Sequence, residues 1–237
     1  MHMDRVVGFF ERWIATLDEN HRGRYITSMA DILPQPAGSS GPDQYPASAP
    51  PRRMIVGISG ASGIVYGIRL LETLRRLGIE SHLVMSRSAE VTSAHESGLK
   101  VADIRALADV TYAVTDIAAA ISSGSFRTMG MIVAPCSVRS LSEIASGVTS
   151  SLLTRAADVV LKERRRLVLM LRETPLHLGH IRSMAAVTEM GAIVYPPVPA
   201  FYANPQSLDD MVDHTIGRVL DLFDIDTGRV RRWGEGG

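Results

Sequence analysis

The fold is decided by a ten-residue stretch, MIVGISGASG at positions 54–63. Its first half is a short apolar run, and its second half is rich in glycine and serine. Apolar residues at the spacing of one helix face follow over 65–77, and Gly78 stands where a helix C-cap is expected. A strand that is apolar throughout is buried on both faces, as in a parallel sheet. The stretch therefore predicts a strand, a glycine-rich turn and a helix.

The rest of the chain repeats this alternation. Apolar strands are predicted at 82–85, 129–134, 167–171 and 192–195, and helices at 90–96, 141–144, 150–162, 180–190 and 207–223. This pattern is typical of an α/β protein with a parallel sheet and helices on both faces. In such sheets ligands bind beyond the carboxyl ends of the strands, so the residues that follow each strand form the candidate site.

The composition argues against several functional classes. The 237 residues carry 25 Lys and Arg against 25 Asp and Glu, so there is no broad basic field for nucleic acid. Hydrophobic residues make up 46% and charged residues 21%, which argues against disorder. No run approaches the ~18 apolar residues of a membrane span. The single cysteine, Cys136, excludes an intrachain disulfide and a multi-cysteine zinc site, and we expect a cytoplasmic protein.

The first 53 residues differ from the rest, which divides the chain into an N-terminal extension, 1–53, and a main domain, 54–237. Apolar residues at helical spacing predict a short amphipathic helix, formed by Val6, Phe9, Phe10, Trp13, Ile14 and Leu17. A stretch at 34–51 has the Pro, Gly and Ser content of a linker. The polar face of the helix is not rich in Lys or Arg, so a partner subunit or the main domain is favoured over a membrane as its cover.

Glycines and serines follow three of the predicted strands. Residues 60–62, Gly-Ala-Ser, open a helix whose backbone N–H groups suit a phosphate, although a plain strand-to-helix turn is an equal alternative. Ser86 follows the second strand and, taken alone, is favoured as a helix N-cap. Ser137 and Ser140 follow the strand at 129–134 and suit a phosphate or the edge of a flavin ring.

Charged residues stand at the end of the next strand. Arg172 can grip a phosphate through two N–H groups, and Glu173 can act as an acid or a base. The alternative is a surface ion pair of little energetic weight. Lys162, on the preceding helix, either joins this cationic group or belongs to a solvated face. Cys136 is favoured as a buried thiol over a nucleophile.

The last strand is followed by a rigid apolar wall at 196–199. Beyond it, the phenol of Tyr202 can hydrogen-bond an anion, and Arg218 on the final helix can face the same pocket. The string DDMVD at 209–213 matches the metal-binding motif of prenyl diphosphate synthases. A helix capping box at 207–210 is the favoured interpretation, and no metal site is expected.

Several motifs occur together and in order, namely GASG at 60–63, APCS at 134–137, RAAD at 155–158, LKERR at 161–165, RE at 172–173, PAFY at 199–202 and RWGE at 232–235. On these motifs, residues 54 to about 235 resemble the UbiX/Pad-type flavin prenyltransferases. The resemblance implies a flavodoxin-like Rossmann fold, a dodecamer and a site at a subunit junction. It also implies metal-independent transfer of a dimethylallyl group from dimethylallyl phosphate to N5 and then C6 of reduced FMN, which makes prenylated FMN for a UbiD-type decarboxylase.

The resemblance also carries over residue roles. The positions that match catalytic residues are Glu96, Lys162, Glu173 and Tyr202. Contacts to FMN match Gly60, Ala61, Ser62, Ser86, Ser137, Val138, Arg139, Ser140 and Arg172. Contacts to dimethylallyl phosphate match Lys162, Arg172, Tyr202 and Arg218. Arg155 and Trp233 look like supporting or neighbouring-subunit positions.

Two other functions stay open. An FMN-dependent decarboxylase of the peptidyl-cysteine or phosphopantothenoylcysteine type resembles this fold, but it carries a Pro-x-Met-Asn motif where this chain reads PCSV at 135–138. The other alternative is a non-catalytic, FMN-binding accessory subunit of an aromatic acid decarboxylase. One departure from the family pattern is Arg182-Ser183, where the family often has Glu-Asn, so an acid is replaced by a base.

Overall fold

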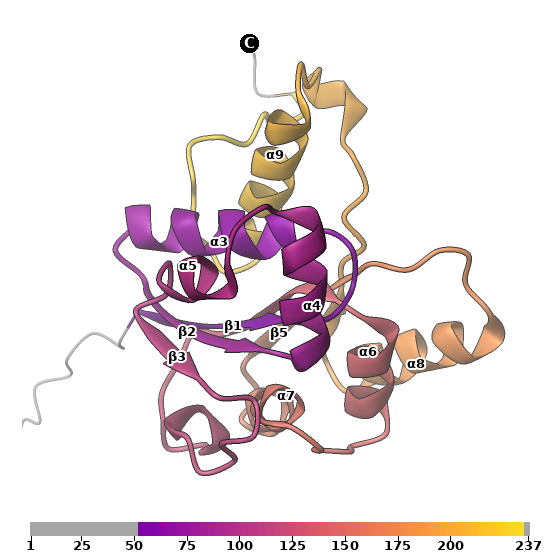
Figure 1. Cartoon of the computed structure of the whole chain (residues 1–237). Helices are drawn as coiled ribbons and strands as arrows, with labels where there is room; N and C mark the ends of the chain where they lie inside the picture. Colours follow the sequence, from indigo (N-terminus) through magenta and orange to yellow (C-terminus); the bar gives the residue numbers. More distant parts are fainter. Residues whose placement is uncertain (1–51, 235–237) are drawn as a thin grey trace, which may run out of the picture. The chain divides into compact units, whose positions relative to one another are not determined.

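The computed structural model describes residues 52–234. The helix and linker predicted within residues 1–51 lie outside the described residues, so the extension stays a prediction. The described part is an α/β unit built on one sheet (Figure 1). Its first strand begins at Arg53, one residue before the predicted domain boundary.

The sheet has six strands in the order β3-β2-β1-β4-β5-β6, and every neighbouring pair is parallel. The strands are β1 (Arg53–Ile58), β2 (Glu80–Met85), β3 (Val110–Tyr112), β4 (Gly130–Cys136), β5 (Arg166–Leu171) and β6 (Ile193–Val194). Without the short edge strand β3, the other five have the 2-1-3-4-5 order of flavodoxin-like folds. The predicted fold class is therefore confirmed.

Helices cover both faces of the sheet, as Figure 1 shows. On one face lie α3 (Ile64–Arg76), α4 (Arg87–Glu96), α5 (Val101–Arg105) and α9 (Leu208–Asp221). On the other lie α6 (Val138–Ala145), α7 (Leu152–Lys162) and α8 (Leu178–Glu189). Two short 3-10 turns, η1 (Ala120–Ser122) and η2 (Phe201–Ala203), complete the described elements.

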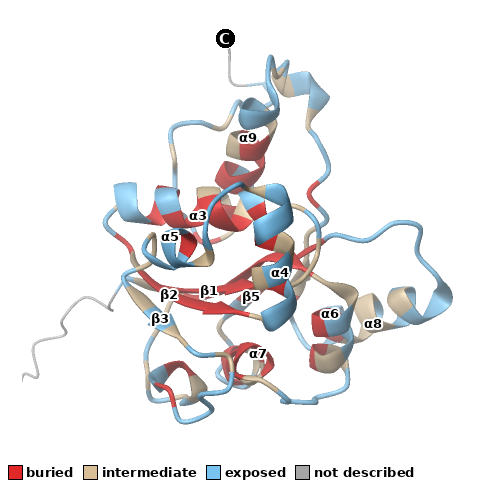
Figure 2. Ribbon diagram, in the orientation of Figure 1, coloured by how far each residue is buried: buried red, intermediate tan, exposed pale blue. Residues whose placement is uncertain are grey.

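The apolar strands are buried on both faces (Figure 2), so apolar and polar residues do not alternate along them. In β1, Met54 and Val56 belong to the core under α3 and α9, whereas Ile55 belongs to the core over α6 and α7. Two apolar cores, one per face, hold the central strands rigidly in place. The loops at the carboxyl ends of these strands therefore start from fixed positions.

The local signals for helix ends are confirmed. Gly78 adopts a φ of 63° after α3, a left-handed conformation that glycine reaches without a steric penalty. Ser207 caps α9 in a capping box with Asp210. Asp209 and Asp213 bind Arg69 on α3, so this acidic string fastens α9 to α3. Within residues 52–234, no group of three or more His, Cys, Asp and Glu side chains is arranged to hold a metal ion.

Two elements were not predicted. Strand β3 has only three residues, and none of them is fully buried, so it lacks the apolar run that marks the other strands. Helix α5 has five residues and a single buried side chain, Ile104. Across the described part of the chain, no helix is long and apolar enough to span a bilayer.

Candidate functional site

The candidate site lies where the strand order reverses. The chain leaves β1 toward β2 on one side and reaches β4 on the other, so the loops after β1 and β4 flank a crevice at the carboxyl edge of the sheet. These loops are residues 59–63 and the Ser137 turn that starts α6. The sequence-predicted glycines and serines are therefore brought together by the topology.

The glycine-rich loop is held at its end by Glu96. Gly63 has a φ of 100°, a left-handed conformation that suits glycine, and it directly precedes α3. The Glu96 carboxylate accepts hydrogen bonds from the backbone N–H groups of Gly63 at 2.8 Å and Ile64 at 3.1 Å. Burial works to raise the pKa of Glu96. The bonds from the Ser62 hydroxyl and these two N–H groups, with nearby Arg172, outweigh it, so the pKa lies below its usual value.

Glu96 therefore stays ionised at neutral pH and fills the role of an anion at the start of α3. In this state the carboxylate fixes the loop rather than offering a proton. The catalytic role predicted for Glu96 stays a prediction, while its contact with Ser62 places it next to a predicted FMN-binding residue.

A serine-lined cavity of about 410 Å³ opens where three helices begin. Each helix is capped by a serine whose hydroxyl accepts a backbone N–H: Ser86 caps α4, Ser137 caps α6 and Ser151 caps α7. All three serines line the cavity. The N-termini of three helices and the hydroxyls of their cap serines therefore lie around one cavity. This arrangement suits a phosphate.

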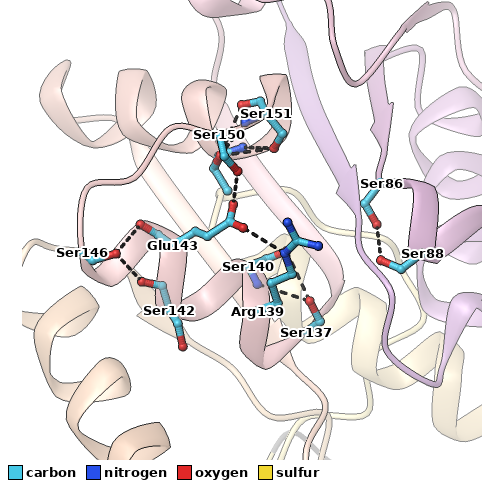
Figure 3. A network of polar contacts seen from close by, with 11 residues as sticks. Ser86, Ser88, Ser137, Arg139, Ser140, Ser142, Glu143, Ser146, Ser150 and Ser151 are labelled. Carbon is cyan, nitrogen blue, oxygen red and sulfur yellow. Dashed lines mark hydrogen bonds and ion pairs between the residues drawn. The ribbon is translucent and has the colours of Figure 1, made fainter.

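Charged and polar side chains that line this cavity are hydrogen-bonded to one another, as Figure 3 shows. The two carboxylate oxygens of Glu143 accept from Arg139 at 2.9 Å and from the Ser150 hydroxyl at 2.8 Å. Glu143 thus links α6 to the start of α7. On the opposite side, the hydroxyls of Ser86 and Ser88 lie 3.1 Å apart (Figure 3).

A second, larger cavity of about 740 Å³ adjoins the first, and the two share Ser88, Ser137 and Arg139. Its walls come from the ends of β1, β4, β5 and β6 and the loops after them, and from the first turn of α4. They comprise Gly60, Ala61, Ser62, Ser88, Ser137, Val138, Arg139, Leu171, Arg172, Glu173, Thr174, Pro196, Pro197 and Val198. The predicted apolar wall after the last strand thus faces the predicted glycine loop.

Arg172 connects the loop after β5 to the glycine-rich loop. Its guanidinium Nε donates to the Ser62 carbonyl at 3.1 Å, and its charge acts on both Glu96 and Tyr66. Burial raises the pKa of Tyr66 above its usual value, and Arg172 partly opposes this rise. Glu173, the next residue, is exposed at the cavity wall and accepts from the Thr174 N–H at 3.1 Å.

Cys136 is buried, as predicted. It is 0% exposed, and burial raises the pKa of its thiol to about 12. A thiol with this pKa is not a nucleophile at neutral pH, so the chemistry of the site belongs to the serines, Arg172 and the carboxylates.

Four predicted site residues are absent from the linings of both cavities: Glu96, described above, and Lys162, Tyr202 and Arg218. Lys162 is the last residue of α7, whereas Ser151 at the other end caps the helix beside the cavity. Eleven helical residues separate the two ends by roughly 16 Å. Tyr202 packs edge-on against His214 and Trp233, and Arg218 pairs with Asp221.

Two further tyrosines, Tyr66 and Tyr195, are partly buried against the core on the α3 and α9 face of the sheet. Burial raises the pKa of Tyr195, the residue after β6, and the charge of Arg218 partly opposes this rise.

Several of these residues were missed from the sequence. Tyr66 and Tyr195 carry no motif that marks them. Ser151 was placed inside the helix predicted over 150–162, whereas it is the N-cap of α7 and forms a capping box with Thr154. Ser88 was passed over because it lies three residues beyond the end of β2 and inside α4.

Comparisons with known proteins define the class first. The model of the Flavoprotein family matches residues 43–220. Among curated proteins, flavin prenyltransferase UbiX of Escherichia coli (strain K12) is 59% identical over 175 residues, covering 73% of this chain and 93% of that protein.

Solved structures agree. A crystal structure of AnUbiX (PadA1) in complex with FMN and dimethylallyl pyrophosphate has a TM-score of 0.77 and 52% identity, and covers 78% of this chain and 99% of that one. A structure from Escherichia coli O157:H7, described as a dodecameric FMN-dependent UbiX-like decarboxylase, has a TM-score of 0.75 and 48% identity, with coverages of 76% and 98%. The chain belongs to the UbiX flavin prenyltransferase family.

Proposed function

We propose that this protein transfers a dimethylallyl group from dimethylallyl phosphate to reduced FMN, at N5 and then C6, without a metal ion. The product, prenylated FMN, would serve a UbiD-type decarboxylase. The observation that carries the proposal is the pair of joined cavities at the strand-order reversal, one polar with three helix N-termini and one with apolar walls.

The two cavities fit the two ends of FMN. The serine-lined cavity supplies hydroxyl and backbone N–H donors for a phosphate, from Ser86, Ser137 and Ser151. The adjoining cavity supplies the flat apolar surface of Pro196 and Pro197, against which a flavin ring can lie. FMN would therefore span the shared residues, with its ring toward Arg172.

The residues around the ring position have the chemistry that the transfer needs. Arg172, fixed on the Ser62 carbonyl, offers a cation for the leaving phosphate. Glu173, exposed at the cavity wall, is placed to accept the proton that leaves C6. Pro196, Pro197 and Val198 give this part of the cavity an apolar wall, which would help to keep water from an allylic carbocation once a neighbouring subunit covers the exposed Val198.

The remaining donor-phosphate residues would come from assembly. Lys162, Tyr202 and Arg218 lie outside the two joined cavities, and a homododecamer would bring such residues from neighbouring copies. Large apolar side chains stand exposed near the cavity mouth and along the C-terminal segment, among them Val198 at 71% and Trp233 at 81%. The relative from Escherichia coli O157:H7 is described as dodecameric. A cytoplasmic location is part of this proposal.

The test uses the purified full-length protein with anaerobically reduced FMN and dimethylallyl phosphate, in the presence of EDTA. Mass spectrometry of the flavin should show the gain of one C5H8 unit. Tyr202→Phe and Glu173→Gln should lose this product while still binding FMN. The same assay with dimethylallyl diphosphate separates the two donors. FMN that binds and returns unmodified with both donors would refute the proposal.

The alternative is an FMN-dependent decarboxylase, which the name of the Escherichia coli O157:H7 relative favours. Its test is release of CO2 from an aromatic acid by the protein loaded with FMN alone. CO2 release without a prenyl donor would favour this alternative. Stable binding to a decarboxylase without turnover would instead indicate an accessory subunit.

A further inference from the structure

Ser59 joins the two loops of the site without lining either cavity. It is the first residue after β1 and is 1% exposed. It stands outside the walls of the 410 Å³ and the 740 Å³ cavities, directly before Gly60, which lines the larger one. A buried polar side chain in this place requires hydrogen-bond partners.

The partners of the Ser59 hydroxyl lie at the end of β4 and on the loop that follows it. Its hydroxyl donates to the Pro135 carbonyl at 3.0 Å and accepts from the Ser137 N–H at 2.7 Å. Its backbone N–H also donates to the Pro135 carbonyl, at 3.1 Å. The paired register of β1 and β4 ends at Gly57 and Val133, so these bonds extend the connection past the ladder with a side chain.

Both loops depend on this link. On its own side, the Ser59 carbonyl accepts from the Ala61 N–H at 2.8 Å, which closes the turn that presents Gly60 to the cavity. On the other side, the Ser137 N–H is held by Ser59 while the Ser137 hydroxyl accepts from the Ser140 N–H at 3.3 Å and caps α6. The Ser59 backbone N–H and hydroxyl therefore both tie the two loops together, and the hydroxyl supplies the contact to the Ser137 N–H.

We propose that Ser59 is a positioning residue, whose hydroxyl holds the glycine-rich loop and the Ser137 loop at the separation that FMN requires. This inference rests on the proposed function. It assigns Ser59 an effect on flavin affinity through residues 60–62 and 137–140, with no contact to FMN. A structural role alone would lower stability and leave the flavin affinity of the folded protein unchanged.

A matched control exists at the other end of the sheet. Ser81 is 0% exposed, and its hydroxyl likewise makes two bonds: it donates to the Asp109 carboxylate at 2.8 Å and accepts from the Asp109 N–H at 3.1 Å. Ser81 pairs with Met54 at the amino ends of β1 and β2, remote from the site. Ser59→Ala and Ser81→Ala each remove one donated and one accepted bond.

The experiment measures FMN dissociation constants of the full-length protein by titration of flavin fluorescence, with visible circular dichroism of the bound flavin and urea midpoints. We expect Ser59→Ala to bind FMN about tenfold more weakly, the scale of one well-made hydrogen bond, and to change the dichroism. Ser59→Thr, which keeps the hydroxyl, should stay within about twofold of wild type. Ser81→Ala should lower the urea midpoint and leave the dissociation constant unchanged.

Equal FMN affinity of Ser59→Ala and Ser81→Ala would overturn the inference, and so would a Ser59→Thr variant as weak as Ser59→Ala. If Ser59→Ala does not fold, Ser59→Thr is compared with wild type, and FMN binding about tenfold weaker despite the retained hydroxyl would overturn the inference. Wild-type protein that binds FMN without prenylating it would refute the proposed function and leave Ser59 to be judged on affinity. Wild-type protein that does not bind FMN would overturn both.

Discussion

Gly67, the fourth residue of α3, lies against the backbone of strand β4. A Cβ atom there would stand 2.5 Å from the Ala134 carbonyl oxygen and 2.7 Å from Cδ1 of Ile58. A carbon–oxygen contact normally needs about 3.3 Å, so Gly67→Ala requires a shift of about 0.8 Å. The obstacle is backbone of the central strand β4, which cannot rotate away.

Two opposing effects decide the outcome. Alanine in place of a mid-helix glycine favours the helix by about 1 kcal/mol. Overpacking in a rigid core costs about 1–3 kcal/mol, and the contact with backbone puts Gly67 at the upper part of that range. We therefore expect Gly67→Ala to lower the free energy of unfolding by about 1–2 kcal/mol, even though alanine has the higher helix propensity. Ala134 leads into the Ser137 loop, so FMN affinity should also fall.

The assay is urea unfolding at one fixed protein concentration, followed by far-ultraviolet circular dichroism. The midpoint should fall while the slope with denaturant stays constant. Gly217→Ala is the control, because Gly217 is also inside a helix but its added Cβ would meet the side chains of Val230 and Thr227 on the segment after α9. That segment can adjust, so the control should lose less. A Gly67→Ala midpoint at or above wild type would refute the reasoning.

Three further predictions follow from buried or bonded groups. Cys136, with a thiol pKa of about 12, should not react with a disulfide reagent in the native protein at pH 8, and one thiol should appear after denaturation. Burial lowers the pKa of His82 below 6.5, so the native state favours the neutral ring. The stability that the neutral His82 ring contributes is complete above pH 6.5 and is lost as the pH falls through the lowered pKa. Over that range, the urea midpoint of His82→Gln should therefore depend less on pH than the midpoint of the wild-type protein. Glu96→Gln, which removes the anion at the start of α3, should lower stability by about 1 kcal/mol in the same unfolding assay, and an unchanged midpoint would contradict its capping role.

The sequence identified the site loops because their chemistry is local. A glycine such as Gly63 is required by its own backbone conformation, and a serine such as Ser137 caps the helix that starts beside it. These requirements involve neighbours in the chain, so residue order alone reveals them. Arg172 was singled out in the same way, by its place at the end of a buried strand, and the structure places it against Ser62.

The link made by Ser59 was not readable in the same way. Its partners, Pro135 and Ser137, are more than 70 residues away, as the separations of 76 and 78 show. Tyr195 also lacked a sequence signal, because the side chains near it belong to α3 and α9, which are remote from it in the sequence or follow it. Such contacts depend on how the strands are ordered in the sheet.

By itself the sequence determined the alternation of buried strands and helices, the caps at helix ends and the burial of Cys136, because each follows from local conformation or from solvent exclusion along one element. Only the tertiary structure decided that three helix N-termini meet at one cavity, that Ser59 spans the two loops, and that Lys162, Tyr202 and Arg218 stand apart from it. The reason is that distances between residues remote in sequence are set by strand order and by packing across the two cores, which local propensity does not encode.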